Sequence, residues 1–259
     1  MNDSLYIAAT GMHAEQAQID TVANNLVNMN TVGFKKSRVD FATLMPESTN
    51  RTAHADATAL AGSWQGMGVA HSGAIADFTP GALKQTLGEY DLAIQGRGMF
   101  EVQLPDGSFA YTRSGSFHLD NDGYLVNADG YPLSAMIQLP SDAEKVLVGN
   151  DGRVQIKNKN SSQLVDIGYI EISHFANDAG LAPLGDNLYV AGAASGSVLY
   201  SRAGENGAGT ISQGYLEASN VQMIEELTNM MTAQRAYEAN ARILQASDEI
   251  VGIINNLRK

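Results

Sequence analysis

Histidines and carboxylates are the side chains of this sequence with the most catalytic potential, yet their spacing forms no known catalytic or metal-binding pattern. The five histidines are His13, His54, His71, His118 and His174. No two have metal-ligand spacing, and neither an HExxH motif nor a Gly-x-x-x-x-Gly-Lys loop occurs. There is no cysteine, which excludes thiolate nucleophiles, disulfides, iron–sulfur clusters and cysteine-ligated zinc. We therefore expect no catalytic residues, no metal site and no cofactor.

Two glycine-containing segments match ligand-binding loops only in part. Residues 118–129 (HLDNDGYLVNAD) resemble a calcium loop, but the first position is His118 and the last is Asp129 rather than Glu. Plain hairpin turns are the preferred interpretation. Gly96-Arg97-Gly98 lacks the third glycine of a dinucleotide-binding loop, because Glu101 stands at that position. It is predicted to be a tight turn that enters a strand.

The charge balance excludes several classes of partner. The chain has 259 residues and a net charge of −12, which argues against binding to nucleic acid or to an anionic membrane surface. Its apolar runs are too short to span a bilayer, so no membrane insertion is expected. The N-terminus lacks the basic and apolar regions of a secretory signal peptide.

Glycine and proline divide the chain into helical ends and a turn-rich centre. Residues 1–44 and 215–259 contain three of the 26 glycines and none of the six prolines. Both residue types disfavour helix interiors and mark turns. The sequence therefore predicts an α+β fold, with a long helix at each end and a β-rich centre.

Residues 1–44 predict a long N-terminal helix with one apolar face. Asn28, Asn30 and Gly33 indicate where it ends, after about 25 residues or roughly 37 Å. Apolar residues recur every seven positions on one helix face, at Leu5, Met12, Ile19 and Leu26.

Residues 215–259 predict a second, longer helix. Ser219 and Gln222 form a capping-box pattern, so we expect the helix to begin at Ser219 and to run for about 38 residues. Its apolar positions also recur by seven, at Met223, Met230, Tyr237, Leu244 and Val251. The two stripes are buried either against each other or against partner chains, and partner chains would cover more of such wide stripes.

The centre is predicted to consist of hairpins. Asp-Gly or Asn-Asp-Gly turns lie between alternating apolar residues within 99–113, 116–134 and 145–157. Further strands are expected at 165–175 and 187–190. Residues 46–75 and 191–213, rich in small residues, are expected to be extended. The predicted domains are 1–44 with 215–259 (helical assembly), 45–85 (extended linker) and 86–214 (β-rich outer domain).

Three separated segments resemble one family. Residues 5–36 are similar to the N-terminal signature of bacterial flagellar rod and hook proteins, centred on Ala23-Asn24-Asn25-Leu26 and followed by Gly33-Phe34-Lys35. Residues 213–250 resemble the family's other end, through Ser219-Asn220-Val221 and Gln234-Arg235-Ala236-Tyr237-Glu238. Residues 96–117 are similar to its β-domain entry. The resemblance covers nearly the whole chain.

This resemblance implies an architecture and a role. In the family, the terminal helices pair as a coiled-coil-like arm that lines a central channel, and the β-rich centre forms the outer wall. The implied protein is a non-enzymatic structural subunit that self-assembles into a hollow helical drive shaft. The residues expected at the assembly interface are Leu5, Met12, Ile19, Asn24, Asn25, Leu26, Asn30, Gly33, Phe34, Ser219, Asn220, Val221, Met230, Gln234, Arg235, Tyr237, Leu244 and Val251.

The resemblance also implies partners and a location. The partners would be further copies in a helical polymer, other rod proteins, the hook protein, surrounding ring proteins and the flagellar export apparatus. The location would be the basal-body rod in the periplasm, reached without a cleaved signal peptide. Length and residues 234–238 favour a distal rod subunit. A proximal rod paralogue and a soluble β-rich binding module with dimerising helical arms are the alternatives, and an enzyme is the weakest.

Overall fold

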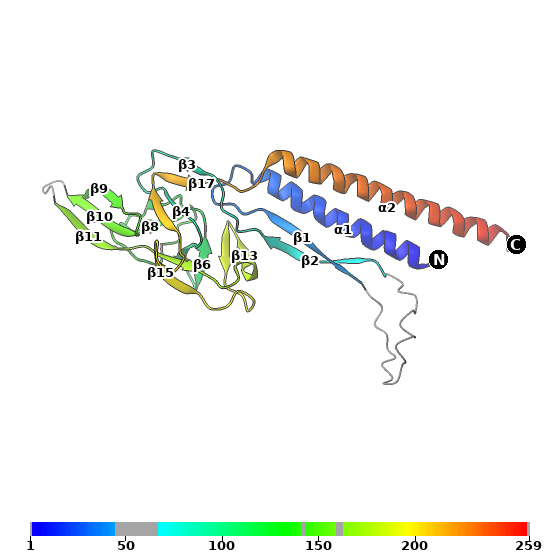
Figure 1. The fold of residues 1–259 in the computed structure, drawn as a ribbon, viewed down its shortest axis with the longest axis horizontal. Coiled ribbons are helices and arrows are strands. Elements are labelled where there is room, and N and C mark those ends of the chain that lie inside the picture. The colour runs from blue at the N-terminus through cyan, green and yellow to red at the C-terminus, as the bar shows by residue number, and fades with distance from the viewer. Residues whose placement is uncertain (1, 45–66, 141–142, 159–162, 258–259) are drawn as a thin grey trace, which may run out of the picture. The chain divides into compact units, whose positions relative to one another are not determined.

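The computed structural model describes residues 2–44, 67–140, 143–158 and 163–257, and its contacts divide the chain into two units (Figure 1). The helical unit comprises Met1–Leu26, Ser37–Ile75 and Gln222–Lys259. The β-rich unit comprises Val27–Lys36 and Ala76–Val221. The predicted α+β class, with terminal helices and a β-rich middle, is confirmed. The division into assembly domain, linker and outer domain stays a prediction.

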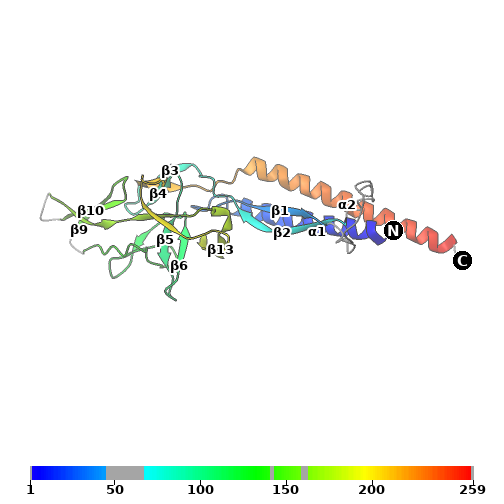
Figure 2. The ribbon, with the colours of Figure 1, turned by 60° about the horizontal axis from the view of Figure 1, so that its bottom comes forward.

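The helical unit contains the two long helices, α1 (Asn2–Val27) and α2 (Met223–Leu257), which lie side by side in Figures 1 and 2. The first predicted helix is confirmed. The second begins at Met223 and not at Ser219, so the capping-box prediction is wrong. The Ser219 hydroxyl instead accepts a local bond from the Val221 N–H at 3.3 Å. Among the described residues, neither helix has an apolar stretch long enough to cross a bilayer.

Small and polar residues contribute two contacts between the two helices. The side-chain amide of Asn25 donates to Glu226 Oε2 at 3.2 Å, and both side chains are buried. A Cβ atom on Gly11 would lie 2.9 Å from Asn240 Nδ2. Both pairs fit one antiparallel register. The coiled-coil form of the pairing stays a prediction.

A two-stranded sheet, β1 (Ser37–Thr43) with β2 (Val69–Ala76), completes the helical unit and lies beside α1 in both views (Figures 1 and 2). Asn25 Oδ1 accepts from the Ser37 N–H at 2.9 Å, and the Thr10 hydroxyl accepts from the Val69 N–H at 3.4 Å. Within the segment expected to be extended, residues from Val69 on therefore form a paired strand. Residues 45–66 lie outside the described residues.

The β-rich unit is built from short strands and one short 3-10 helix. The strands are β3 (Leu83–Gln85), β4 (Leu92–Gln95), β5 (Phe100–Gln103), β6 (Phe109–Thr112), β7 (His118–Leu119), β8 (Leu125–Val126), β9 (Ala143–Val148), β10 (Arg153–Asn158), β11 (Leu164–Tyr169), β12 (Glu171–His174), β13 (Ala182–Gly185), β14 (Leu188–Val190), β15 (Leu199–Arg202), β16 (Thr210–Gln213) and β17 (Tyr215–Glu217). The 3-10 helix is η2 (Asp178–Gly180).

Three hairpins predicted from Asp-Gly turns are confirmed. The pairs β5–β6, β7–β8 and β9–β10 are antiparallel and join strands that are neighbours in the sequence. Their turn glycines, Gly107, Gly123 and Gly152, have φ between 81° and 83°, a region that glycine occupies without a Cβ clash. The apparent calcium loop at 118–129 is thus the β7–β8 hairpin and the turn after it.

Other ladders join segments that are far apart in the sequence. In the four-stranded sheet the order is β13-β14-β6-β5, and in the three-stranded sheet it is β11-β10-β9. Strand β12 pairs with β15, β16 with β4, and β17 with β3. Strands β15 and β16 lie within 191–213, so part of the segment that was expected to be extended is paired into ladders. Apolar side chains from these ladders, including Ile94, Phe100, Val154, Ile172 and Ile211, form one buried core.

Candidate functional site

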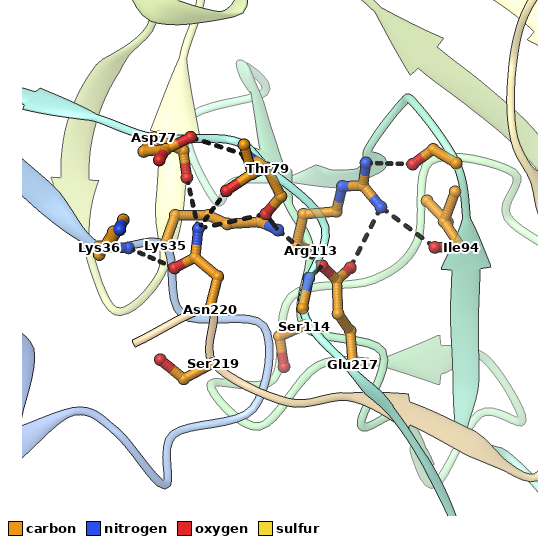
Figure 3. Close-up of polar contacts among 12 residues, drawn as sticks. Lys35, Lys36, Asp77, Thr79, Ile94, Arg113, Ser114, Glu217, Ser219 and Asn220 are labelled. Carbon is orange, nitrogen blue, oxygen red and sulfur yellow. Dashed lines mark hydrogen bonds and ion pairs between the residues drawn. The ribbon is translucent and has the colours of Figure 1, made fainter. Parts of the chain in front are cut away.

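A buried cluster of three charged side chains lies in the β-rich unit, where residues 27–36 and 217–221 meet (Figure 3). Glu217 Oε1 is 2.6 Å from Lys35 Nζ, and Glu217 Oε2 is 3.1 Å from an Arg113 guanidinium nitrogen. The three side chains are 1%, 0% and 3% exposed, in that order. We call them the Glu217 cluster.

Each member of the Glu217 cluster comes from a different segment. Lys35 lies in the stretch before β1, Arg113 directly follows β6, and Glu217 ends β17. Lys35 also donates to the Thr79 carbonyl at 2.8 Å, and the Gly81 N–H donates to Glu217 Oε1 at 2.8 Å. The Glu217 carboxylate therefore connects the end of β17 with the stretch before β1, the end of β6 and the stretch before β3.

Hydrogen bonds to backbone carbonyls satisfy two nitrogens of the Arg113 guanidinium, whereas its buried Nε has no hydrogen-bond partner among the described residues. Its guanidinium donates to Ile94 O at 3.2 Å and to Gly96 O at 2.6 Å, as Figure 3 shows. Burial lowers the pKa of both Lys35 and Arg113, and the Glu217 carboxylate opposes that shift in each. Buried charges of this kind persist only when they are paired and hydrogen-bonded. The cluster is therefore suited to fixing chain geometry.

Asn220, predicted as an interface residue, lies beside this cluster and bonds to three backbone groups (Figure 3). Its Oδ1 accepts from the Lys36 N–H at 2.7 Å, and its Nδ2 donates to the Asp77 carbonyl at 2.9 Å and the Thr79 carbonyl at 3.2 Å. The Asp77 N–H in turn donates to the Lys36 carbonyl at 2.8 Å. One amide side chain, which follows β17, thus connects the stretch before β1 with the stretch after β2.

Replacing Asn220 by alanine is expected to destabilise the β-rich unit by about 2–3 kcal/mol, because the Lys36 N–H and the Asp77 carbonyl each lose a bond in a partly buried site. The control Ser219→Ala removes only the local bond to Val221 and should cost less than about 1 kcal/mol. Urea unfolding of both variants measures the difference, and equal stabilities would contradict the assigned role of Asn220.

Gly33, also predicted, is buried within Val27–Lys36, the first segment of the β-rich unit. Its φ is +70°, and its N–H donates to the Glu217 carbonyl at 2.8 Å. A Cβ atom at this position would lie 2.4 Å from the backbone nitrogen of Ser114. Both the backbone conformation and the lack of space therefore require glycine.

The predicted interface residues of the helical unit differ in burial. Asn25 is buried against Glu226, as described above. The heptad residues are half-buried, namely Leu5, Met12, Ile19, Leu26, Met230, Tyr237 and Leu244. Asn24, Gln234 and Arg235 are exposed, and Val251 lies in α2. The seam itself is lined by smaller side chains, including the fully buried Ala8, Val22 and Ala233.

The remaining predicted residues belong to the β-rich unit. Asn30 is exposed, whereas Phe34, Ser219 and Val221 are half-buried. The structure brings Gly33 and Asn220 to the Glu217 cluster. That these positions form subunit interfaces stays a prediction.

Sequence reasoning missed the three charged residues of the cluster. Lys35 stood in the motif Gly33-Phe34-Lys35, and Glu217 lay within the matched segment 213–250, but a lysine or glutamate ordinarily indicates a solvated position. Their isolated occurrence beside apolar neighbours in short β segments was the available signal. Glu226, which is buried against Asn25, was missed for the same reason.

Comparison with family models identifies the class of protein. The flagellar basal-body rod model matches residues 5–35, the flagellar hook protein FlgE/F/G D1 domain matches 93–156, and the C-terminal model of flagellar basal-body rod FlgEFG proteins matches 212–257. These three regions include α1, the hairpins of the β-rich unit and α2. They define a structural, non-enzymatic class of flagellar proteins.

Full-length relatives identify the family. A FlgG basal-body rod protein of Borreliella burgdorferi is 41% identical over 265 residues, which is all of both chains. One of Buchnera aphidicola is 40% identical over 260 residues, 99% of this chain and all of its own. A FlgF rod protein of Caulobacter vibrioides is 34% identical over 260 residues, 96% of this chain and 95% of its own. The chain belongs to the flagellar hook and basal-body rod family, and its similarity is to the FlgG type.

Proposed function

We propose that this chain is a structural subunit of the flagellar basal-body distal rod, where copies assemble into a hollow helical shaft that transmits torque from motor to hook. The observation that carries the proposal is the exposed apolar face of α2. Ile224 is 82% exposed and Met231 is 55% exposed, with Leu227 between them on the same helix face. The FlgG similarity over the whole chain supports the same role.

Further exposed apolar residues extend along the helical unit. Ile243, Ile250 and Ile253 are each more than half exposed near the end of α2, and Tyr6 is similarly exposed near the start of α1. Several large exposed apolar side chains along the same pair of helices favour an interaction surface there. Further copies of the chain would cover this surface in the polymer.

The proposal includes the neighbours of the rod. Besides its own copies, the subunit would contact other rod proteins, the hook protein and surrounding ring proteins. It would reach the periplasmic rod through the flagellar export apparatus, without a cleaved signal peptide. The heptad residues of both helices and the polar residues of the Asn-rich motifs would form the assembly interfaces.

Similarity favours the distal over the proximal rod. The FlgG relatives are 37–41% identical to this chain, whereas the FlgF relative is 34% identical. Labelling the subunit in isolated basal bodies distinguishes the two positions. Label in the segment next to the hook supports the distal assignment, and label nearer the motor contradicts it.

Replacing Met231 by aspartate tests the assembly surface. A charge in the middle of a buried apolar contact must be desolvated without a partner, so we expect the concentration needed for polymerisation to rise by about tenfold or more. The β-rich unit should unfold as in the wild type. Sedimentation of purified protein and swimming of a bacterium that carries only the variant measure the effect.

Thr232→Asp is the matched control, since it adds the same charge at the adjacent exposed position. It lies outside the apolar row and should leave assembly nearly unchanged. Normal rods and swimming with Met231→Asp would overturn the role of this face.

A further inference from the structure

A pocket with a buried carboxylate lies on the β-rich unit, away from the Glu217 cluster. Its volume is about 360 Å³, at the lower end of the roughly 300–1,000 Å³ of small-molecule pockets. The lining residues are Glu101, Leu133, Ser134, Ala135, Tyr169, Ile170, Glu171, Ser173 and Tyr200. None of them has a part in the proposed assembly.

Strand register explains why these side chains meet. Ser173 of β12 stands opposite Tyr200 of β15 and opposite Met99 at the start of β5. Opposed residues share a face, and so do residues two apart on one strand. Glu101 and Glu171 are therefore on the same face as Ser173 and Tyr200.

Glu101 is the charged group inside the pocket, with a residue exposure of 6%. The Ser134 hydroxyl donates to Glu101 Oε1 at 2.6 Å, and the Tyr200 hydroxyl donates to Glu101 Oε2 at 2.8 Å. The hydroxyl of Tyr111, which stands opposite Glu101 in the β5–β6 pair, also lies within hydrogen-bonding reach of this carboxylate and of Tyr200. The carboxylate therefore keeps only part of its acceptor capacity for a further donor. No cation pairs with Glu101 among the described residues.

Ser173 supplies an independent indication of a ligand. The residue is 1% exposed, lines the pocket, and its hydroxyl has no hydrogen-bond partner. An unsatisfied buried hydroxyl costs free energy unless a ligand or water meets it. Here it faces the same space as the Glu101 carboxylate.

The remaining hydrogen-bonding capacity of the pocket is mostly that of acceptors. The hydroxyl protons of Ser134 and Tyr200 are already used by Glu101, which leaves their oxygens and both carboxylates as acceptors. Ala135 and the rings of Tyr169 and Tyr200 provide apolar wall, whereas the side chains of Leu133 and Ile170 belong to the buried core on the opposite face. Such a site suits a group with several donors on an apolar stem.

Cations already occur at the pocket's rim. The Arg202 guanidinium carbon lies 4.6 Å from the Tyr169 ring centroid, and that of Arg153 lies 5.6 Å from it. Arg202 also stands opposite Glu171 in the ladder, and Arg153 contacts Asp166 and Asp151. The rim thus carries both positively and negatively charged side chains, whereas the charged side chain in the interior is the carboxylate of Glu101.

We propose that this pocket binds a guanidinium or primary ammonium group on a short alkyl stem. The cation would bond to the free acceptor positions of Glu101 and to the Ser173 hydroxyl, and its stem would pack on the apolar wall. An arginine or lysine side chain of a neighbouring copy and a free amine share this chemistry.

Titrating the full-length monomer with n-butylguanidinium, followed by amide NMR shifts, tests the proposal. We expect saturable shifts at the pocket residues, and no such shifts with the uncharged n-butanol. Glu101→Gln should weaken binding by about tenfold, because a charge-assisted hydrogen bond is lost. Glu171→Gln, at an exposed rim position, keeps the test valid if Glu101→Gln does not fold, and should weaken binding by a smaller factor.

Glu144→Gln is the matched control, since Glu144 is an exposed glutamate paired with Lys157 on other strands, and it should bind as the wild type does. Absence of saturable shifts, or equal shifts with n-butanol, would show that the pocket holds water only and would overturn the proposal. So would unchanged affinity in both pocket variants.

Repeating the titration on assembled protein distinguishes the two sources, and this arm alone rests on the proposed function. If a neighbour's side chain fills the pocket, the assembled form no longer binds the probe although the monomer does. If a free amine is the ligand, both forms bind it. Either result retains the assigned chemistry.

Discussion

Replacing Glu217 by alanine is expected to destabilise the β-rich unit by about 3–5 kcal/mol, because Lys35 and Arg113 would remain buried without their counter-ion. The Gly81 N–H would lose its acceptor as well. Urea unfolding followed by the near-ultraviolet circular dichroism of the tyrosines, most of which lie in this unit, measures the change.

Two further variants separate charge from packing. Glu217→Gln keeps the shape of the side chain but removes its negative charge. It should therefore show most of the destabilisation expected for Glu217→Ala. Glu144→Ala removes an exposed ion pair with Lys157 and should cost less than about 1 kcal/mol. Wild-type stability of Glu217→Gln would refute the electrostatic role of the cluster.

Gly33→Ala is expected to cost about 3 kcal/mol or more. A φ of +70° is strained for alanine, and the new Cβ would lie 2.4 Å from the Ser114 nitrogen and 2.6 Å from the Arg113 carbonyl carbon. Any shift that relieves the clash also disturbs the hydrogen bond from the Gly33 N–H to the Glu217 carbonyl. Thermal unfolding of the purified variant gives the size of the effect.

Gly107→Ala is the control for backbone strain alone. Its φ is +83°, but no atom lies within 4 Å of the added Cβ. It should cost about 1 kcal/mol. If both variants are destabilised equally, the lack of space beside Gly33 does not contribute to the cost, which would contradict the clash with Ser114 as its cause.

Local sequence signals predicted the elements that local interactions determine. Asp-Gly turns determine the β5–β6, β7–β8 and β9–β10 hairpins, and heptad spacing together with the Asn28–Gly33 region determines α1. Strands β15 and β16 escaped prediction because each is four residues long, lies among glycines and depends on a partner far away in the sequence. The start of α2 was misplaced because the Ser219 hydroxyl bonds to Val221, within the turn before the helix.

The candidate site was predictable only at its uncharged positions. Gly33 adopts a positive φ and Asn220 bonds to backbone groups, and both properties are typical of these residue types. Both residues lie beside the Glu217 cluster. The burial of Lys35 and Arg113 depends on Glu217, which is supplied by a strand from the other end of the chain. No local pattern specifies such a pairing, because each charge on its own would favour solvent.

The hydrogen bond from the Gly33 N–H to the Glu217 carbonyl joins the two segments of the β-rich unit, because Gly33 belongs to Val27–Lys36 and Glu217 to Ala76–Val221. The two segments are separated in the sequence by Ser37–Ile75 of the helical unit, so the β-rich unit is discontinuous. Changes of loop length within Ala76–Val221 that leave both partners of this bond in place would therefore keep the first segment held at the same point of the β-rich unit.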